Sequence, residues 1–332
     1  MIKEAINKLV NGEDLSYETV ETVMDEIMSG ETPNELISAY LVALRMKGET
    51  IDEVSGSAMG MRNNGIKLEH DMDVLEIVGT GGDEAFTFNI STTSAIVAAA
   101  AGCKVAKHGN RSVSSKSGAA DVLEALGVNI TIEPEQSKEL LEKIGICFLF
   151  AQKYHSSMRF VGPVRKQLGM RTIFNILGPL TNPAGANMEI LGVYDEALVE
   201  PLAEVLIKLG VKKGMDVMDE ITLSAKTTVC EIRNGKTNKY EINPEDYGFK
   251  ICSKDDLVGG DAKANAEITR EILNGKKGPK TDAVLLNAGA CIYMTRDDVT
   301  YEEAINIARQ TIESGKAKEK LEQFIEMSNS FK

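Results

Sequence analysis

Residues 74–83 read VLEIVGTGGD, and this stretch decides the fold class. Its apolar start, Val74 to Val78, predicts a buried strand, and the glycines that follow predict a tight loop. Residues 89–92, NIST, then open an alanine-rich segment typical of a helix. A strand, a glycine-rich loop and a helix N-terminus in this order favour phosphate binding, because glycine allows close backbone approach and unpaired N–H groups point at the anion.

A second glycine-containing element follows at residues 107–111, KHGNR. It places three potential cations, Lys107, His108 and Arg111, beside a run of serines in a chain that is otherwise acidic, with 50 acidic against 37 basic residues and a net charge of −13. Nonspecific nucleic-acid binding depends on phosphate neutralisation by a basic surface. The sequence therefore predicts a site for a small anion, and we expect no nucleic-acid partner.

Composition places the chain among ordinary globular proteins, with 332 residues, 43% of them hydrophobic and 26% charged. No apolar run approaches the roughly 20 residues that span a bilayer, and the N-terminus lacks an apolar signal segment. We expect a cytoplasmic protein with no membrane association. The five cysteines are scattered and the chain has three histidines, so neither structural zinc nor a disulfide framework is predicted.

The order of predicted elements changes along the chain. Roughly the first 65 residues predict short helices, with capping boxes at residues 32–35 and 50–53. From about residue 73, strands alternate with helices, which is the signature of a mostly parallel α/β sheet. A proline-punctuated break at residues 154–183 predicts a return to the N-terminal helices. The predicted strands are 74–78, 104–106, 128–132, 146–151, 190–194, 227–233 and 239–242, and the predicted helices of the second part include 134–144, 262–273, 283–293 and 301–314.

The ordered set of motifs resembles the anthranilate phosphoribosyltransferase family of tryptophan biosynthesis. It comprises residues 79–83, 89–92, 107–111 and 171–183, with 43–50 near the start and 282–288 near the end. The resemblance implies a small α-helical N-terminal domain plus a large α/β domain with a mostly parallel central sheet. It assigns residues 1–69, completed by about 156–185, to the small domain, and 70–155 and 186–332 to the large one. It also implies a homodimer joined through the helical domain.

The same resemblance implies transfer of the phosphoribosyl group from 5-phosphoribosyl 1-diphosphate to the amine of anthranilate, with two Mg²⁺ ions bound at the donor diphosphate. An aromatic amine is neutral and nucleophilic near pH 7, so we expect catalysis by positioning and charge, with Lys107, His108 and Arg111 as catalytic residues. The implied donor-binding residues are Gly79, Gly82, Asp83, Thr87, Asn89, Ile90, Ser91, Thr92, Lys107, His108, Gly109, Asn110, Arg111, Ser112, Val113, Ser114, Ser115 and Ala119. The implied anthranilate-binding residues are Gly79, Asn110, Tyr154, His155, Met158, Arg165 and Arg171. The implied metal ligands are Ser91, Asp219 and Glu220.

One segment departs from the family pattern. Only Met215 to Met218 separate Gly214 from Asp219 and Glu220, where the family usually has a full apolar strand. The departure predicts either loss of most of one strand or displacement of the acidic pair, with impaired binding of a second metal ion.

Two other readings stay open. A pyrimidine nucleoside phosphorylase of the same fold typically has Lys-His-Ser-Thr-Gly-Gly where this chain has KHGNR. A noncatalytic nucleic-acid-binding relative should have a basic surface and degraded substrate motifs, which the net charge of −13 and the presence of Arg165 oppose.

Overall fold

A single mixed sheet forms the centre of the larger part of the molecule. The computed structural model describes residues 1–81, 86–112, 116–218 and 220–331. Within these residues the strand order is β3-β2-β1-β4-β5-β6-β7. The strands β3, β2, β1, β4 and β5 pair in parallel, and β6 and β7 add an antiparallel edge. The expected mostly parallel α/β sheet is confirmed. The bounds are β1 Leu75–Gly79, β2 Val105–Gly109, β3 Ile146–Phe150, β4 Met188–Val193, β5 Lys213–Met218, β6 Thr227–Arg233 and β7 Lys236–Ile242.

Helices cover both faces of this sheet. α5 and α13 pack against one face, while α11 packs against β5 and β6 on the other face, beside α4. No helix in the described ranges is both long and apolar enough to cross a bilayer. The α-helices are α1 Ile2–Val10, α2 Tyr17–Met28, α3 Asn34–Lys47, α4 Ile51–Asn63, α5 Ile90–Ala100, α6 Ala119–Leu126, α7 Pro134–Ile144, α8 Ala151–Tyr154, α9 Gly162–Leu168, α10 Phe174–Leu177, α11 Val199–Lys208, α12 Ala262–Leu273, α13 Pro279–Thr295, α14 Tyr301–Glu313 and α15 Lys316–Ser330. Short 3₁₀ turns lie at Ser156–Phe160, Pro179–Thr181, Glu196–Leu198, Pro244–Tyr247 and Lys254–Leu257.

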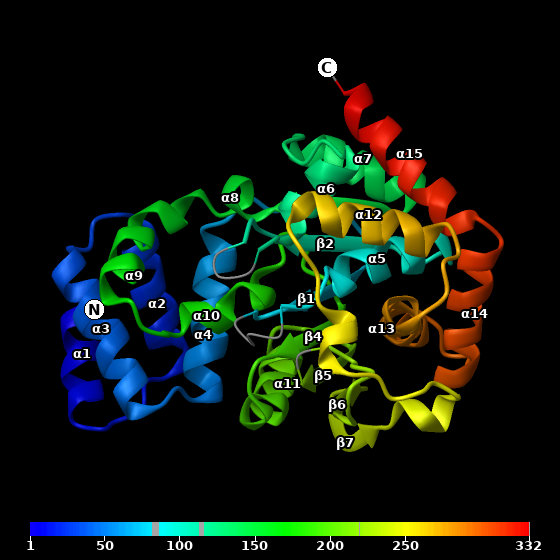
Figure 1. Cartoon of the computed structure of the whole chain (residues 1–332). Helices are drawn as coiled ribbons and strands as arrows, with labels where there is room; N and C mark the ends of the chain where they lie inside the picture. The colour runs from blue at the N-terminus through cyan, green and yellow to red at the C-terminus, as the bar shows by residue number, and fades with distance from the viewer. Residues whose placement is uncertain (82–85, 113–115, 219, 332) are drawn as a thin grey trace.

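The N-terminal helices form a second apolar core. Val20, Met24 and Leu44 are buried there together with Val161 and Leu177 from the later segment. Figure 1 shows α1 to α4 in blue with α9 and α10 in green on the same side of the molecule, and the sheet with α12 to α15 on the other. The segment around residues 156–181 therefore returns to the N-terminal helices, as its break in rhythm predicts. The domain bounds themselves stay a prediction.

Two local predictions are wrong. Residues 128–132 form no strand, although Val128, Ile130 and Ile132 are buried as their alternation suggests. The Asn129 amide donates to the Ser328 hydroxyl at 3.0 Å, so the segment packs under α15 rather than joining β3. The predicted capping box at residues 32–35 is also absent, because α3 begins at Asn34 with Pro33 as its N-cap and has no side-chain cap. The predicted capping box at Thr50 is present.

The shortened segment keeps its strand. β5 pairs with β4 from Met188 opposite Lys213 to Val193 opposite Met218, and with β6 on its other side. The expected loss of most of a strand is wrong, because Lys213 and Gly214 become part of β5. A consequence is that Asp216 lies in the middle of a buried strand with a fully buried side chain.

Candidate functional site

The two glycine-rich elements leave the sheet side by side. β1 ends at Gly79 and β2 ends at Gly109, and these strands pair in parallel. Since the carboxyl ends of parallel strands meet at one edge of a sheet, both loops start there. α5 begins nearby at Ile90, and the first turn of a helix carries N–H groups without intrahelical acceptors. Of the predicted donor residues, Gly82, Asp83, Val113, Ser114 and Ser115 lie outside the described residues.

Lys107 provides a buried cation beneath these loops. Its side chain is 3% exposed, and its Nζ donates to the Ile77 carbonyl at 2.5 Å and lies 3.5 Å from the Ser91 hydroxyl. Burial lowers the pKa of Lys107, while the charges of Glu76 and Glu220 oppose that effect. The amine thus stands between the end of β1 and the start of α5, where a bound phosphate would meet positive charge.

Buried hydroxyls accompany this cation. The Oγ1 atoms of Thr80 and Thr92 are buried, and neither has a hydrogen-bond partner within the described ranges. Thr92 lies in the first turn of α5, and Thr87 forms an isolated antiparallel bridge with Val258. A buried polar atom without a partner is unfavourable unless a ligand or water satisfies it. These hydroxyls therefore fit a ligand rich in oxygen atoms.

The second loop is held against the start of α6. The Asp121 carboxylate accepts the backbone N–H groups of Ser112 and Gly118, each at 2.9 Å. A Cβ atom at Gly118 would clash with the Ser112 backbone nitrogen, and one at Gly109 would lie 3.1 Å from the Cβ of Ala119. The close approach of the Ser112 backbone explains why glycine is needed at position 118, whereas a side chain at position 109 would press on the side chains of Phe148 and Ala119. This packing places Ser112 and Ala119 at the base of the loop.

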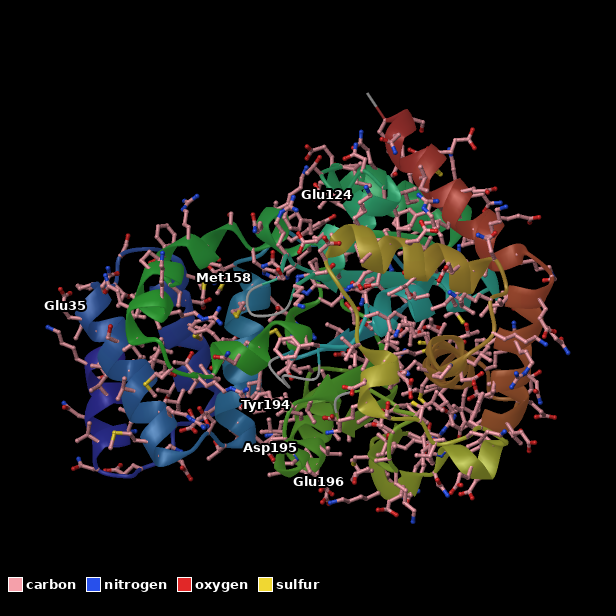
Figure 2. The ribbon with its side chains drawn as sticks, viewed as in Figure 1. Glu35, Glu124, Met158, Tyr194, Asp195 and Glu196 are labelled. Carbon is pink, nitrogen blue, oxygen red and sulfur yellow. The ribbon has the colours of Figure 1, made fainter. Side chains whose placement is uncertain are left out.

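The side chain of Arg111 is bound to acidic residues of α6. Its guanidinium pairs with Asp121 at 3.1 Å and with Glu124 at 2.9 Å, and it lies over the Phe150 ring at 5.5 Å. Figure 2 shows Glu124 on α6 near the top of the view. Arg111 would have to leave these partners before it could contact a phosphate, so its predicted catalytic role has no support from this geometry.

His108 and His155 form a buried pair of rings with centroids 5.1 Å apart. Burial lowers the pKa of His155 to about 4, although its ring hydrogen-bonds the Thr181 carbonyl at 3.0 Å. Burial also lowers the pKa of His108 well below its ordinary value. Both rings are therefore neutral near pH 7. The expectation that His108 supplies a cation is not supported, and its Nε2 has no partner among the described residues.

A set of side chains between the sheet and the N-terminal helices fits a second, aromatic ligand. Arg165 on α9 is partly buried over the Phe174 ring at 5.7 Å, and no carboxylate within the described ranges pairs with it. Burial lowers the pKa of this arginine. Met158 packs against the apolar core of the N-terminal helices. Figure 2 shows Tyr194 between these helices and the sheet, and Arg171 stacks over the Tyr194 ring at 4.0 Å.

Two further residues predicted to bind anthranilate, Asn110 and Tyr154, lie in different surroundings. Asn110 is exposed at the end of β2, and its Oδ1 accepts from the Gln152 amide at 3.3 Å. Tyr154 instead is 1% exposed, and its hydroxyl donates to Ser137 on α7 at 3.1 Å. Its side chain therefore belongs to the core beneath β3 and does not line a channel.

Oxygen ligands for a divalent cation are present near Lys107. The Ser91 hydroxyl lies there, and the Glu220 carboxylate is close enough for its charge to act on Lys107. Asp219 lies outside the described residues. Across the described ranges, no three His, Cys, Asp or Glu side chains converge as metal ligands. Hydroxyl and carboxylate oxygens are hard ligands that fit Mg²⁺, whose remaining positions are commonly filled by substrate phosphate and water.

Comparison with known proteins decides the family. Two family models match the chain, the glycosyl transferase family a/b domain over residues 71–318 and the glycosyl transferase family helical bundle domain over residues 3–65. The anthranilate phosphoribosyltransferase of Lachnoclostridium phytofermentans is 66% identical over 334 residues, which cover 99% of each chain. This chain belongs to the anthranilate phosphoribosyltransferase family.

Further anthranilate phosphoribosyltransferases agree with this result. The protein of Methanobrevibacter smithii is 60% identical over 99% of this chain and 100% of its own length. The crystal structure from Thermus thermophilus superposes with a TM-score of 0.93 at 42% identity, covering 98% of this chain and 99% of that chain. The structure from Saccharomyces cerevisiae in complex with PRPP and Mg has a TM-score of 0.91 at 28% identity, covering 99% and 98%. The resemblance drawn from the sequence motifs is confirmed over the whole chain.

One feature of the site lies outside the motifs. Glu76 is fully buried, and its carboxylate accepts the His108 N–H at 2.7 Å and the Asn182 side-chain amide. Burial raises the pKa of Glu76 to about 8. The charged residue within the apolar run 74–78 is the one sequence signal that could have drawn attention to it.

Proposed function

We propose that this chain transfers the phosphoribosyl group of 5-phosphoribosyl 1-diphosphate to the amine of anthranilate, giving N-(5-phosphoribosyl)anthranilate and pyrophosphate in tryptophan biosynthesis. The observation that carries the proposal is the buried Lys107 amine at 2.5 Å from the Ile77 carbonyl, beneath the N-terminus of α5. A helix N-terminus above a buried cation suits a phosphorylated ligand. The yeast relative was solved in complex with PRPP and Mg.

Charge development at the donor explains the need for this arrangement. Nucleophilic attack at C1 of the ribose breaks the C1–O bond, which leaves positive charge on the sugar and negative charge on the pyrophosphate. Lys107 and the N–H groups of the first turn of α5 are fixed before the reaction and stabilise the negative charge. The hydroxyls of Thr80 and Thr92 are further groups able to bind phosphate oxygens.

Metal binding fits the same edge of the sheet. Ser91 and Glu220 are the described residues that would hold Mg²⁺, and the resemblance adds Asp219. When bound, the ion neutralises part of the charge of the diphosphate.

The acceptor needs a different environment. The amine of anthranilate is neutral near pH 7, so no side chain has to deprotonate it before attack. His108 and His155 are neutral and buried, and they shape the site without adding charge near the oxocarbenium-like sugar. Arg165 can bind the anthranilate carboxylate through its planar guanidinium, because no acidic side chain in the described part of the chain forms an ion pair with it.

Replacing Arg165 with leucine should raise the KM for anthranilate about 10- to 100-fold, the effect of losing a charge-assisted hydrogen-bonded pair. The KM for the phosphoribosyl donor should stay within about twofold of the wild-type value, because Arg165 lies among the helices and not at the α5 N-terminus. Steady-state kinetics with each substrate varied in turn measures both constants.

Arg159→Leu is the matched control, since Arg159 also stacks on a phenylalanine, at 4.7 Å from the Phe160 ring, but is exposed. Its KM for anthranilate should match that of the wild type. An Arg165→Leu enzyme with unchanged KM for anthranilate, or with a raised KM for the donor alone, would exclude the assigned role.

The proposed function is tested by following the fluorescence of anthranilate in the presence of 5-phosphoribosyl 1-diphosphate and Mg²⁺. We expect the signal to fall only when both substrates are present. The same preparation is incubated with inorganic phosphate and either uridine or thymidine. Release of uracil or thymine without consumption of anthranilate would overturn the proposal and establish a nucleoside phosphorylase.

We further propose a homodimer joined through the helical domain, formed of residues 1–69 and about 156–185. An apolar hollow of about 610 Å³ between α1 and α3 supports it, with Val10 and Met46 at its edge 72% and 82% exposed. A second copy of the same surface would cover these side chains in an isologous contact. Sedimentation should give a dimer for the wild type and a monomer for Met46→Glu, whereas Ile251→Glu, at an exposed apolar residue outside this surface, should remain dimeric. A monomeric wild type would contradict the proposal.

A cytoplasmic location and the absence of a nucleic-acid partner complete the proposed description. The net charge of −13 supports the second statement, since it opposes phosphate binding over a broad surface. A mobility shift of duplex DNA or RNA at moderate salt would contradict the second statement.

A further inference from the structure

The side chain of Asn89, the N-cap residue of α5, is engaged by other protein groups. Its Oδ1 accepts from the Asn265 side-chain amide at 2.9 Å and from the Ser117 hydroxyl at 3.2 Å. Its Nδ2 donates to the Ser117 carbonyl at 3.1 Å. An amide oxygen has two lone pairs, and both are used here. Asn89 therefore links α5 to the end of the second loop, rather than offering its oxygen to a ligand.

Asn265 connects the same point to a third segment. It lies in the first turn of α12 and is 2% exposed, and its Oδ1 accepts the Gly260 N–H at 2.8 Å. The backbone just before Gly260 pairs with the residues that follow the glycine loop, because the Leu257 carbonyl accepts the Phe88 N–H at 3.1 Å. The buried side-chain amide of Asn265 thus hydrogen-bonds both the N-cap residue of α5 and the backbone of Gly260.

The packing around this amide leaves no room for rearrangement. A Cβ atom at Gly259 would lie 2.6 Å from the Oδ1 of Asn265 and 2.6 Å from the Cα of Phe88. The Gly259 N–H also donates to the Phe86 carbonyl at 3.0 Å. The segment 257–260 is therefore held directly against the amide and against the chain that leads into α5.

We propose that Asn265 is a positioning residue for the donor site. Its amide fixes Asn89, and through Asn89 it fixes both the α5 N-terminus and the Ser117 end of the second loop. The groups that meet the donor diphosphate are thereby held in place before it binds, which lowers the cost of ordering them on binding. The kinetic part of this inference rests on the proposed function, whereas its structural part does not.

The test compares Asn265→Ala and Asn265→Asp with the wild type. Asn265→Asp keeps the acceptor for Gly260 but sets a carboxylate oxygen against the Asn89 Oδ1, so it breaks the same link in a chain of nearly unchanged shape. We expect the KM for the phosphoribosyl donor to rise about tenfold in both variants, the effect of losing one buried hydrogen-bonded link. The KM for anthranilate at saturating donor should stay unchanged.

Thr269→Val is the matched control in the same helix. Thr269 is 1% exposed and its hydroxyl lies 2.9 Å from that of Thr93, so the variant loses a buried bond between α12 and α5 without touching Asn89. It should melt at a lower temperature than the wild type but keep its donor KM. Equal increases in donor KM for Thr269→Val and Asn265→Ala would overturn the positioning role.

Hydrogen–deuterium exchange gives a readout that needs no activity. Amides in residues 86–93 and 116–122 should exchange faster together in both Asn265 variants and not in Thr269→Val. Unchanged exchange in residues 116–122 would overturn the inference even if turnover were lost. Faster exchange in both Asn265 variants, together with a wild type that consumes no anthranilate, would instead support the link and contradict the proposed function.

Discussion

Lys107→Met lowers kcat/KM for 5-phosphoribosyl 1-diphosphate by about 100-fold or more, because it removes the fixed cation that meets the charge developing on pyrophosphate. The amine lies in a buried position between the Ile77 carbonyl and the Ser91 hydroxyl, where the attraction to an anion is weakly screened. Methionine has a similar length and fills the same space without charge. The effect should appear in kcat as well as in KM, since the interaction strengthens as the C1–O bond breaks.

The fold should survive this substitution. Glu76, whose charge acts on Lys107, has a pKa raised to about 8 by burial. Because the charge of Lys107 lowers this pKa, removing Lys107 favours the uncharged form of Glu76 further, so the substitution does not leave an uncompensated buried charge. Lys104→Met is the control, because Lys104 lies just before β2 and donates to the carbonyls of Leu141 and Glu142, away from the loops. An active Lys107→Met enzyme, or an equally impaired Lys104→Met enzyme, would contradict the assigned role.

Asp216→Val raises the free energy of unfolding by about 2 kcal/mol near pH 8, the order of the cost of burying a polar group without hydrogen bonds. Both carboxylate oxygens of Asp216 are buried without a hydrogen-bond partner in the described part of the chain. Its neighbours across the sheet are Leu191 on β4 and Cys230 on β6, in an apolar core. Valine has a high strand propensity and suits this site.

The gain should depend on pH. Burial, followed by the charge of Glu189, raises the pKa of Asp216 well above its ordinary value of 3.8. Below this ordinary value both the folded and the unfolded chain hold the proton. As pH rises above it, the unfolded chain ionises and the folded chain does not, so the wild type loses stability. The difference between Asp216→Val and the wild type should therefore be larger near pH 8 than near pH 4.

Urea unfolding at both pH values measures this difference. Glu76 and Glu189 are also buried acids with raised pKa values, and they are present in both proteins, so the comparison isolates the Asp216 carboxyl together with its interaction with Glu189. Asp216→Asn should remove the pH-dependent part of the difference while keeping a buried polar group. A valine variant that is no more stable than the wild type at either pH would contradict the prediction and show that the Asp216 carboxylate has hydrogen-bond partners in the folded protein.

The sequence predicts best where the determining signals are local. α7 and α12 begin and end at the predicted residues 134–144 and 262–273. Pro134 occupies the first turn of α7 and Gly145 ends it in the left-handed conformation, while the Asp261 side chain caps α12 at the Ala264 N–H. The strand, loop and helix order around Gly79 is similarly local. Such signals need no knowledge of the tertiary structure.

The missed features depend on partners that are distant in sequence. Lys213 and Gly214 carry no strand signal, and β5 forms because β4 and β6 offer pairing on both sides. Tyr154 is predicted to bind anthranilate, but its hydroxyl instead donates a hydrogen bond to Ser137 on α7. Asn265 lies 176 residues from Asn89. Only the fold brings these pairs together.

The transfer of the phosphoribosyl group to anthranilate is tested most directly by measuring anthranilate loss and pyrophosphate release in the same reaction. The reaction contains 5-phosphoribosyl 1-diphosphate and Mg²⁺. The proposed transfer predicts equal molar amounts of the two, with neither change when either substrate is omitted. Pyrophosphate release without loss of anthranilate, or no loss of anthranilate by a folded wild-type protein, would contradict it.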